Sequence, residues 1–166
     1  MASLLDALER ERLLKDSAAA SGQVPPGEPP HVSLLRLCEA GLLVGGLTVG
    51  YGVRPDELVG SLTAAMGGAA RRLKIVDVRE RPALELHVAA GDVTERWEVE
   101  DVPALVHNLN DLYRDAADVR AVAVLGEWED SLQLLCVERH ALGRLLRQPF
   151  FAPVNARALA DLVAPR

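Results

Sequence analysis

The stretch ALELHVAAGDVTERWEV, residues 83–99, decides the fold class of this chain. Two segments of alternating apolar and polar residues flank Gly91 and Asp92, a pair typical of a two-residue β-hairpin turn. This turn pairs Leu86 with Trp97 and places the apolar side chains of both strands on one face. The sequence therefore predicts an antiparallel hairpin with one buried face and one face in water.

Helices and strands are expected on both sides of this hairpin. Apolar residues at helical spacing predict helices that begin near Pro55, Asp101 and His140, and further strands are expected at 74–79, 119–125 and 132–138. The last two strands are apolar on nearly both faces, which indicates that both faces are covered. We expect an α+β fold in which an antiparallel sheet of about five strands is built in the order α-β-β-β-α-β-β-α, with a tethered N-terminal helix.

The N-terminal region divides into two segments. Residues 1–16 contain an amphipathic helix that Ser3 can cap, and we expect it to dock on its own domain, on a dimer mate or on another partner. Residues 17–30 are rich in Ala, Ser and Gly and contain four prolines, which is typical of a linker. Residues 31–166 are then expected to form a single α+β domain.

The segment 33–53 fits two structures. Ser33 to Ala40 can form a short helix that Gly41 ends. Alternatively, residues 42–49 can form a hairpin around a Gly-Gly turn. Both interpretations remain open from the sequence.

Composition and charge exclude several classes of protein. The net charge is −6 at pH 7, and the basic residues do not cluster, which argues against direct binding of nucleic acid. The longest uncharged segment, Ala40 to Val53, is too short to span a bilayer. Cys38 and Cys136 lie in apolar stretches and are expected to be buried free thiols, which fits the reducing cytoplasm.

A short acidic loop provides the candidate contact site. Glu127, Trp128, Glu129 and Asp130 place three carboxylates around one aromatic ring. The loop lacks the ligand spacing of a calcium-binding loop, and we expect no metal or cofactor there. It is either a charged hairpin tip or a contact site anchored by Trp128, in which case the acidic rim selects a partner with a basic surface.

A second candidate lies on the wet face of the hairpin. Glu85 can orient His87, and an oriented histidine can act as a general base. Asp77 together with Glu85 and His87 also resembles the acidic cluster of PD-(D/E)xK nucleases, with a histidine in place of the lysine. No nucleophile or metal partner is fixed by spacing, and cross-strand polar pairs on a solvated face have the same pattern.

The order of elements from Pro55 to Gln148 resembles the type III secretion chaperone-like fold, which the YbjN family also uses. The resemblance lies in the order of helices and strands and carries no residue motif. It implies a small acidic homodimer that binds partner proteins without catalysis. The profilin-like roadblock fold, also dimeric but with a different strand order, is the alternative.

These observations favour a non-catalytic protein-binding module, an adaptor or chaperone-like protein, that forms a homodimer. The second face of strands 119–125 and 132–138 needs cover from the C-terminal helices, from residues 33–50 or from a second subunit. The alternative is a small enzyme or metal-dependent hydrolase that uses Glu85 and His87.

Overall fold

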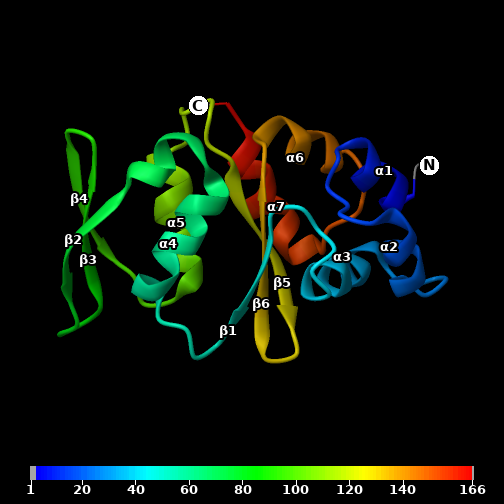
Figure 1. Ribbon diagram of the computed structural model, residues 1–166, viewed down its shortest axis with the longest axis horizontal. Coiled ribbons are helices and arrows are strands. Elements are labelled where there is room, and N and C mark those ends of the chain that lie inside the picture. Colours follow the sequence, from blue (N-terminus) through cyan, green and yellow to red (C-terminus); the bar gives the residue numbers. More distant parts are fainter. Residues whose placement is uncertain (1–2, 166) are drawn as a thin grey trace. The chain divides into compact units, whose positions relative to one another are not determined.

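The computed structural model describes residues 3–165 as two compact units (Figure 1). Unit 1 comprises the chain up to Tyr51 together with the chain from Ala123 onward, and unit 2 comprises Gly52–Val122. The elements are, in order, α1 Leu4–Arg10, α2 Ser17–Gln23, α3 Pro30–Glu39, β1 Gly46–Gly50, α4 Pro55–Met66, the 3-10 helix η1 Gly68–Arg72, β2 Lys74–Arg79, β3 Glu85–Ala90, β4 Val93–Glu98, α5 Val102–Leu112, β5 Ala121–Trp128, β6 Ser131–Val137, α6 Arg139–Leu145 and α7 Pro153–Val163.

The N-terminal helix packs into the core of its own unit. Ser3 caps α1 as expected, since its Oγ accepts a hydrogen bond from the Asp6 N–H at 3.1 Å. Leu4 and Leu8 are buried in a cluster that also contains residues of β5, β6, α6 and α7. Leu13 is buried as well, and its carbonyl accepts from the Val44 N–H at 2.7 Å. Docking of this segment therefore occurs within the chain.

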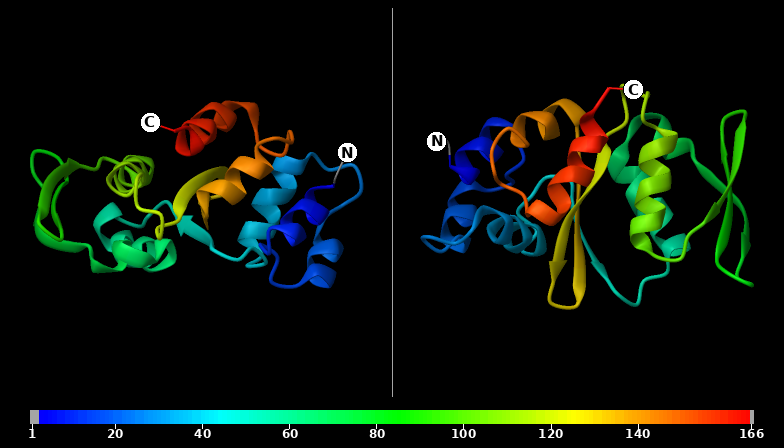
Figure 2. Two further views of the ribbon diagram at one scale, coloured as in Figure 1. Left: turned by 90° about the horizontal axis from the view of Figure 1, so that it is seen from above. Right: turned by 180° about the vertical axis from the view of Figure 1, so that it is seen from behind.

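The segment expected to be a linker contains a helix. Asp16 caps α2 by accepting from the Ala19 N–H at 3.0 Å, and Ala20 is fully buried among the residues of the unit 1 core. The small alanine side chains let this helix pack closely. The four prolines that indicated a linker all follow the helix, at positions 25, 26, 29 and 30. We expected a first helix on a tether. The structure instead has three helices, α1 to α3, that follow one another and lie side by side (Figure 2).

The first of the two interpretations of residues 33–53 is the one observed. Helix α3 ends at Glu39, and Gly41 follows with a φ of 75°, the left-handed conformation that favours glycine. Gly45 then lies directly against the carbonyl of Cys136, where a Cβ atom would collide. This close approach brings β1 into antiparallel pairing with β6, so β1 is a sheet strand and not half of a local hairpin.

The sheet of unit 1 has the strand order β1-β6-β5. Its central strand β6 is buried from Leu132 to Val137, as the apolar pattern on both faces predicted. One face carries Leu125 and Leu135 into the helical core. At the free edge of β5, the Asn155 side chain of α7 donates to the Leu125 carbonyl at 3.2 Å.

The sheet of unit 2 is the meander β2-β3-β4. Its hairpin has the expected register, because Leu86 pairs with Trp97 and His87 pairs with Arg96. Leu86 and Trp97 are buried, and helix α5 packs against β4 on that side. A strand adjacent in sequence, β2, completes the sheet with a bulge between Ile75 and Asp77.

The chain is therefore α+β with two three-stranded antiparallel sheets. The elements from Pro55 to Leu145 follow the order α-β-β-β-α-β-β-α, apart from the added η1, and helix α7 comes after them. The expected single sheet of about five strands is not confirmed. At the start of β5, the side-chain amide of Asn110 bonds both the N–H and the C=O of Val122. A strand whose edge groups are occupied by a side chain has none free at that point for a further strand.

Candidate protein-contact site at the β5–β6 hairpin

The β5–β6 hairpin extends past the end of helix α3 within unit 1 (Figure 1). Its turn consists of Glu129 and Asp130, and Glu129 adopts a φ of 52°. The Ser131 hydroxyl donates to the Trp128 carbonyl at 2.8 Å and closes the turn. The structure thus places the four sequence-predicted residues, Glu127 to Asp130, together at one tip.

A chain of polar side chains fixes the strands behind the tip. Gln133 is fully buried, and its amide nitrogen donates to the Ser131 hydroxyl at 2.8 Å. Its amide oxygen accepts from the Thr48 hydroxyl at 2.8 Å across the β1–β6 pair. Burial of a hydrogen-bonded amide orients the strands because every alternative register leaves it unpaired. The tip is therefore presented on a firmly registered three-stranded sheet.

Trp128 is half-buried, and one face of its ring is covered by Arg36 of helix α3. The guanidinium carbon lies 5.0 Å from the ring centroid, which is a cation–π geometry. The same guanidinium donates to both carboxylate oxygens of Glu28, at 3.3 and 2.8 Å, and the Ser33 hydroxyl donates to Glu28 at 2.8 Å. The hydrogen bond from Arg36 lowers the pKa of Glu28 and raises that of Arg36.

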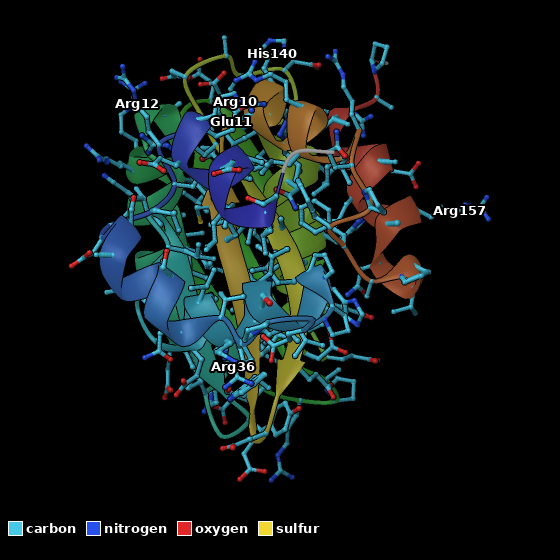
Figure 3. The ribbon with its side chains drawn as sticks, turned by 90° about the vertical axis from the view of Figure 1, so that its right-hand side faces the viewer. Arg10, Glu11, Arg12, Arg36, His140 and Arg157 are labelled. Atoms are coloured by element: carbon cyan, nitrogen blue, oxygen red, sulfur yellow. The ribbon has the colours of Figure 1, made fainter. Side chains whose placement is uncertain are left out.

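This arrangement changes the role expected for Trp128. A ring face already covered by a guanidinium offers less area to a partner than an open ring. Arg36, labelled in Figure 3, instead ties the hairpin to α3. Trp128 therefore fixes the position of the tip, and its remaining exposed part contributes to the contact surface.

The three carboxylates at the tip face water. Glu127, Glu129 and Asp130 are exposed, and none of them forms an ion pair within residues 3–165. The tip therefore carries three uncompensated negative charges on one short turn. Such a rim attracts a basic partner and speeds its association.

Tyr51 also belongs to this tip, although no pattern in the sequence indicates it. The residue follows β1, and the pairing of Gly50 with Ser131 brings it beside the turn. Its side chain is 58% exposed. Partial desolvation raises its pKa, and the charge of Glu127, a hydrogen bond to that carboxylate and the charge of Asp130 act in the same direction. Only the β1–β6 pairing reveals this residue, since Tyr51 and Glu127 are far apart in sequence.

The second candidate, on the sheet of unit 2, contains a formed Glu85–His87 pair. His87 Nε2 lies 2.6 Å from Glu85 Oε1, and both side chains are partly buried. The hydrogen bond from His87 lowers the pKa of Glu85, and Arg96 and Arg79 act in the same direction. Asp77 is the register partner of His87 on β2, so the structure brings the three residues to one face of the sheet.

This face holds His87 beside Glu85, whereas the Asp77 carboxylate is bonded to its own neighbours. Asp77 is bonded to the Val78 N–H and to Arg79. Within residues 3–165, no three His, Cys, Asp or Glu side chains are placed so that they could hold a metal ion. The Glu85–His87 pair is a polar contact between two residues of β3 that lie two positions apart on one face of the sheet.

None of the helices within residues 3–165 combines the length and the apolar character that a membrane span requires. Comparisons with protein-family models, with curated proteins and with solved structures found no match to this chain.

Proposed function

We propose that this chain is a non-catalytic protein-binding module, an adaptor or chaperone-like protein, which binds the basic surface of another protein through the β5–β6 tip. The observation that carries the proposal is the exposed tip itself, where Glu127 and Asp130 lie beside Tyr51 and where the three carboxylates, Glu129 included, form no ion pair within residues 3–165. Exposed aromatic residues next to charge are typical of contact sites.

The proposed module works as a homodimer in the cytoplasm and takes no cofactor. Burial raises the pKa of the Cys38 thiol to about 11, and both cysteines are buried and outside any disulfide. Two buried thiols without a disulfide fit a reducing compartment. The overall acidity of the chain, −6 at pH 7, fits a protein rather than a nucleic acid as partner.

The test is affinity capture from a lysate of the source organism with three versions of the full chain. The first is wild type, the second carries Glu127→Lys, Glu129→Lys and Asp130→Lys, and the third carries the same charge changes at the exposed residues Asp6, Glu9 and Glu39. A stoichiometric protein retained by the first and third versions and lost from the second supports the proposal. A protein retained equally by all three, or by none, contradicts it.

The second candidate function is a small enzyme or metal-dependent hydrolase that uses Glu85 and His87. The observation in its favour is the 2.6 Å contact between the two side chains. A hydrolase should lose its activity on His87→Ala, and it should capture no stoichiometric protein either before or after the substitution. A binding module should capture its partner equally well with and without this substitution, because His87 lies on the sheet of unit 2 and the tip lies in unit 1.

A further inference from the structure

Strand β2 forms an outer edge of the unit 2 sheet, and no strand within residues 3–165 pairs with that edge. The sheet order is β2-β3-β4, and five of the six β2 residues are exposed. Val76 and Val78 are 61% and 37% exposed. Val78 pairs with the buried Leu86, so the apolar face of the sheet continues to β2, where the Val78 side chain is only partly buried. An exposed strand edge with apolar side chains is a template for a further strand.

The backbone at Val78 points outward from this edge. The Val99 N–H donates to the Leu84 carbonyl at 3.0 Å, which makes these residues a hydrogen-bonded pair. Such pairs alternate along an antiparallel ladder, so Leu86 directs its backbone groups toward Trp97. Val78 of β2 lies opposite Leu86 on the other side of β3, and these two residues form a non-hydrogen-bonded pair. Val78 therefore directs its own N–H and C=O away from β3.

A side chain occupies the position of the missing strand. The Val78 N–H donates to Asp77 Oδ1 at 3.0 Å, and the Arg79 Nε donates to Asp77 Oδ2 at 3.2 Å. Both charged side chains are half exposed or more. Asp77 thus accepts the bond that the carbonyl of an adjacent strand would accept.

The charges on this edge are self-complementary. When two β2 strands run antiparallel about a two-fold axis at Val78, Asp77 of each copy lies opposite Arg79 of the other. The two Val78 residues then face each other and exchange their outward N–H and C=O groups. Opposite charges directly across a strand pair stabilise it, and the same contact occurs twice because of the symmetry.

We propose that the occupant of this edge is strand β2 of a second copy of the chain, paired about Val78, so that the two sheets form one continuous six-stranded sheet. Charged residues at a sheet edge ordinarily discourage the pairing of strands. Here Asp77 and Arg79 flank Val78 with opposite charges, so the register with the two Val78 residues opposite each other places every charge against its opposite. The bulge next to Val76 confines the pairing to the part of the strand around Val78. The inference rests on the proposed homodimer and gives it a surface.

A contact made by one short strand is smaller than a standard interface. Stable complexes bury about 1,200–2,000 Å² in total, so we expect a weak dimer with a dissociation constant on the order of 10–100 µM. Sedimentation velocity of the full chain across that range should show a monomer that converts to a dimer.

Val78→Pro tests the backbone contact. Proline removes the outward N–H and is tolerated on a strand edge, and the bonds between β2 and β3 do not use this group. We expect the variant to stay monomeric over the whole range, while Val78→Thr, which keeps the N–H and a branched side chain, should dimerise like wild type. Circular dichroism of both variants checks that the fold is retained.

Charge reversal tests the register. Asp77→Arg and Arg79→Asp should each weaken dimerisation about tenfold, because each places like charges opposite one another twice. The double variant should restore it, and Asp92→Arg, the same charge change at the β3–β4 turn, should have no effect. A wild-type chain that stays monomeric, or a double variant that does not recover, overturns the proposal.

This test is separate from the test of partner binding. The lysine substitutions at the β5–β6 tip leave β2 intact. A tip variant that dimerises but captures no protein therefore places the partner site at the tip and the dimer contact elsewhere, as the β2 assignment requires. A Val78→Pro variant that stays monomeric but still captures the partner supports the β2 interface and shows that the tip acts without it. Dimerisation lost through the tip substitutions instead would place the dimer contact at the tip and overturn the β2 assignment.

Discussion

The side-chain amide of Asn110 bonds both backbone groups of Val122. Its Oδ1 accepts from the Val122 N–H at 2.8 Å, and its Nδ2 donates to the Val122 carbonyl at 2.9 Å. Both residues are buried, so neither group can turn to water when the amide is removed. A residue of helix α5 thereby takes the place of a strand at the beginning of β5.

We expect Asn110→Ala to lower the free energy of unfolding by about 2–3 kcal/mol, because it leaves a buried donor and a buried acceptor unpaired. Asn108→Ala is the matched control on the same helix. Its amide donates only to the Ala104 carbonyl of its own helix, so the change should be within about 1 kcal/mol. Urea unfolding of the three proteins measures the difference, and equal costs at the two positions would contradict the edge-capping role.

The ion pair between Glu11 and Arg144 predicts a pH-dependent contribution to stability. Three hydrogen bonds of 2.7–3.1 Å join the two side chains, and the Glu11 side chain is only 10% exposed (Figure 3 labels Glu11). The hydrogen bond from Arg144 lowers the pKa of Glu11 in the folded state. Because the folded pKa lies below the unfolded one, the stabilisation is complete above the unfolded value near 4.5 and disappears as the pH falls through the folded value.

Glu11→Gln should therefore cost about 1 kcal/mol at pH 7, a value reduced by the half-exposed Arg144, and almost nothing near pH 2. Glu9→Gln, at an exposed position of the preceding helix α1, removes a carboxylate that forms no ion pair within residues 3–165 and is the control for the loss of one charge. Urea unfolding curves of wild type and both variants at pH 7 and near pH 2 measure these costs. A cost for Glu11→Gln that is the same at both would rule out the ion pair as its cause.

Two glycines, one in the middle of helix α4 and one just after it, should respond to substitution in opposite directions. Gly68 has a φ of 55°, and a Cβ there would collide with the side chain and carbonyl of Asp118. Gly60 lies within α4 with open space around its Cα. Gly68→Ala should destabilise the protein by about 2 kcal/mol or more, whereas Gly60→Ala should stabilise it by about 0.5–1 kcal/mol. Thermal unfolding of both variants tests this contrast, which fails if Gly68→Ala is neutral.

The hairpin 83–99 could be predicted from sequence because every signal in it is local. The turn residues set the register, and alternation then placed Leu86 and Trp97 on the same face. The burial of β6 was equally readable from its apolar residues. In both cases the pattern that determines the structure lies within a few residues of the strand.

Features that depend on distant segments could not be read in the same way. Helix α2 is stabilised by the fit of Ala20 into a core built from both ends of the chain, and composition does not show that fit. The role of Asn110 is equally hidden, because this residue looks like any polar helix residue until its position beside Val122 is known. The candidate tip was found as an acidic loop, but Arg36 over Trp128 and Tyr51 beside Glu127 required the tertiary structure.

Tyr51 and Trp128 should therefore differ in what their removal affects. Tyr51→Ala is expected to weaken binding of the captured partner about tenfold without changing the melting temperature, because the side chain is largely exposed. Trp128→Ala is expected to lower the melting temperature, since it removes the ring that Arg36 covers. Calorimetric titration and thermal unfolding of both variants separate the roles, and the interpretation fails if Tyr51→Ala leaves the affinity unchanged.

The most direct measurement of the central claim is hydrogen–deuterium exchange of the full chain with and without its purified partner. The account predicts that binding slows exchange at residues 127–131 and around Tyr51, with little change in the β3–β4 hairpin. Slowed exchange concentrated at residues 83–99, with none at the tip, would contradict a protein-contact site at the β5–β6 hairpin and would direct attention to Glu85 and His87.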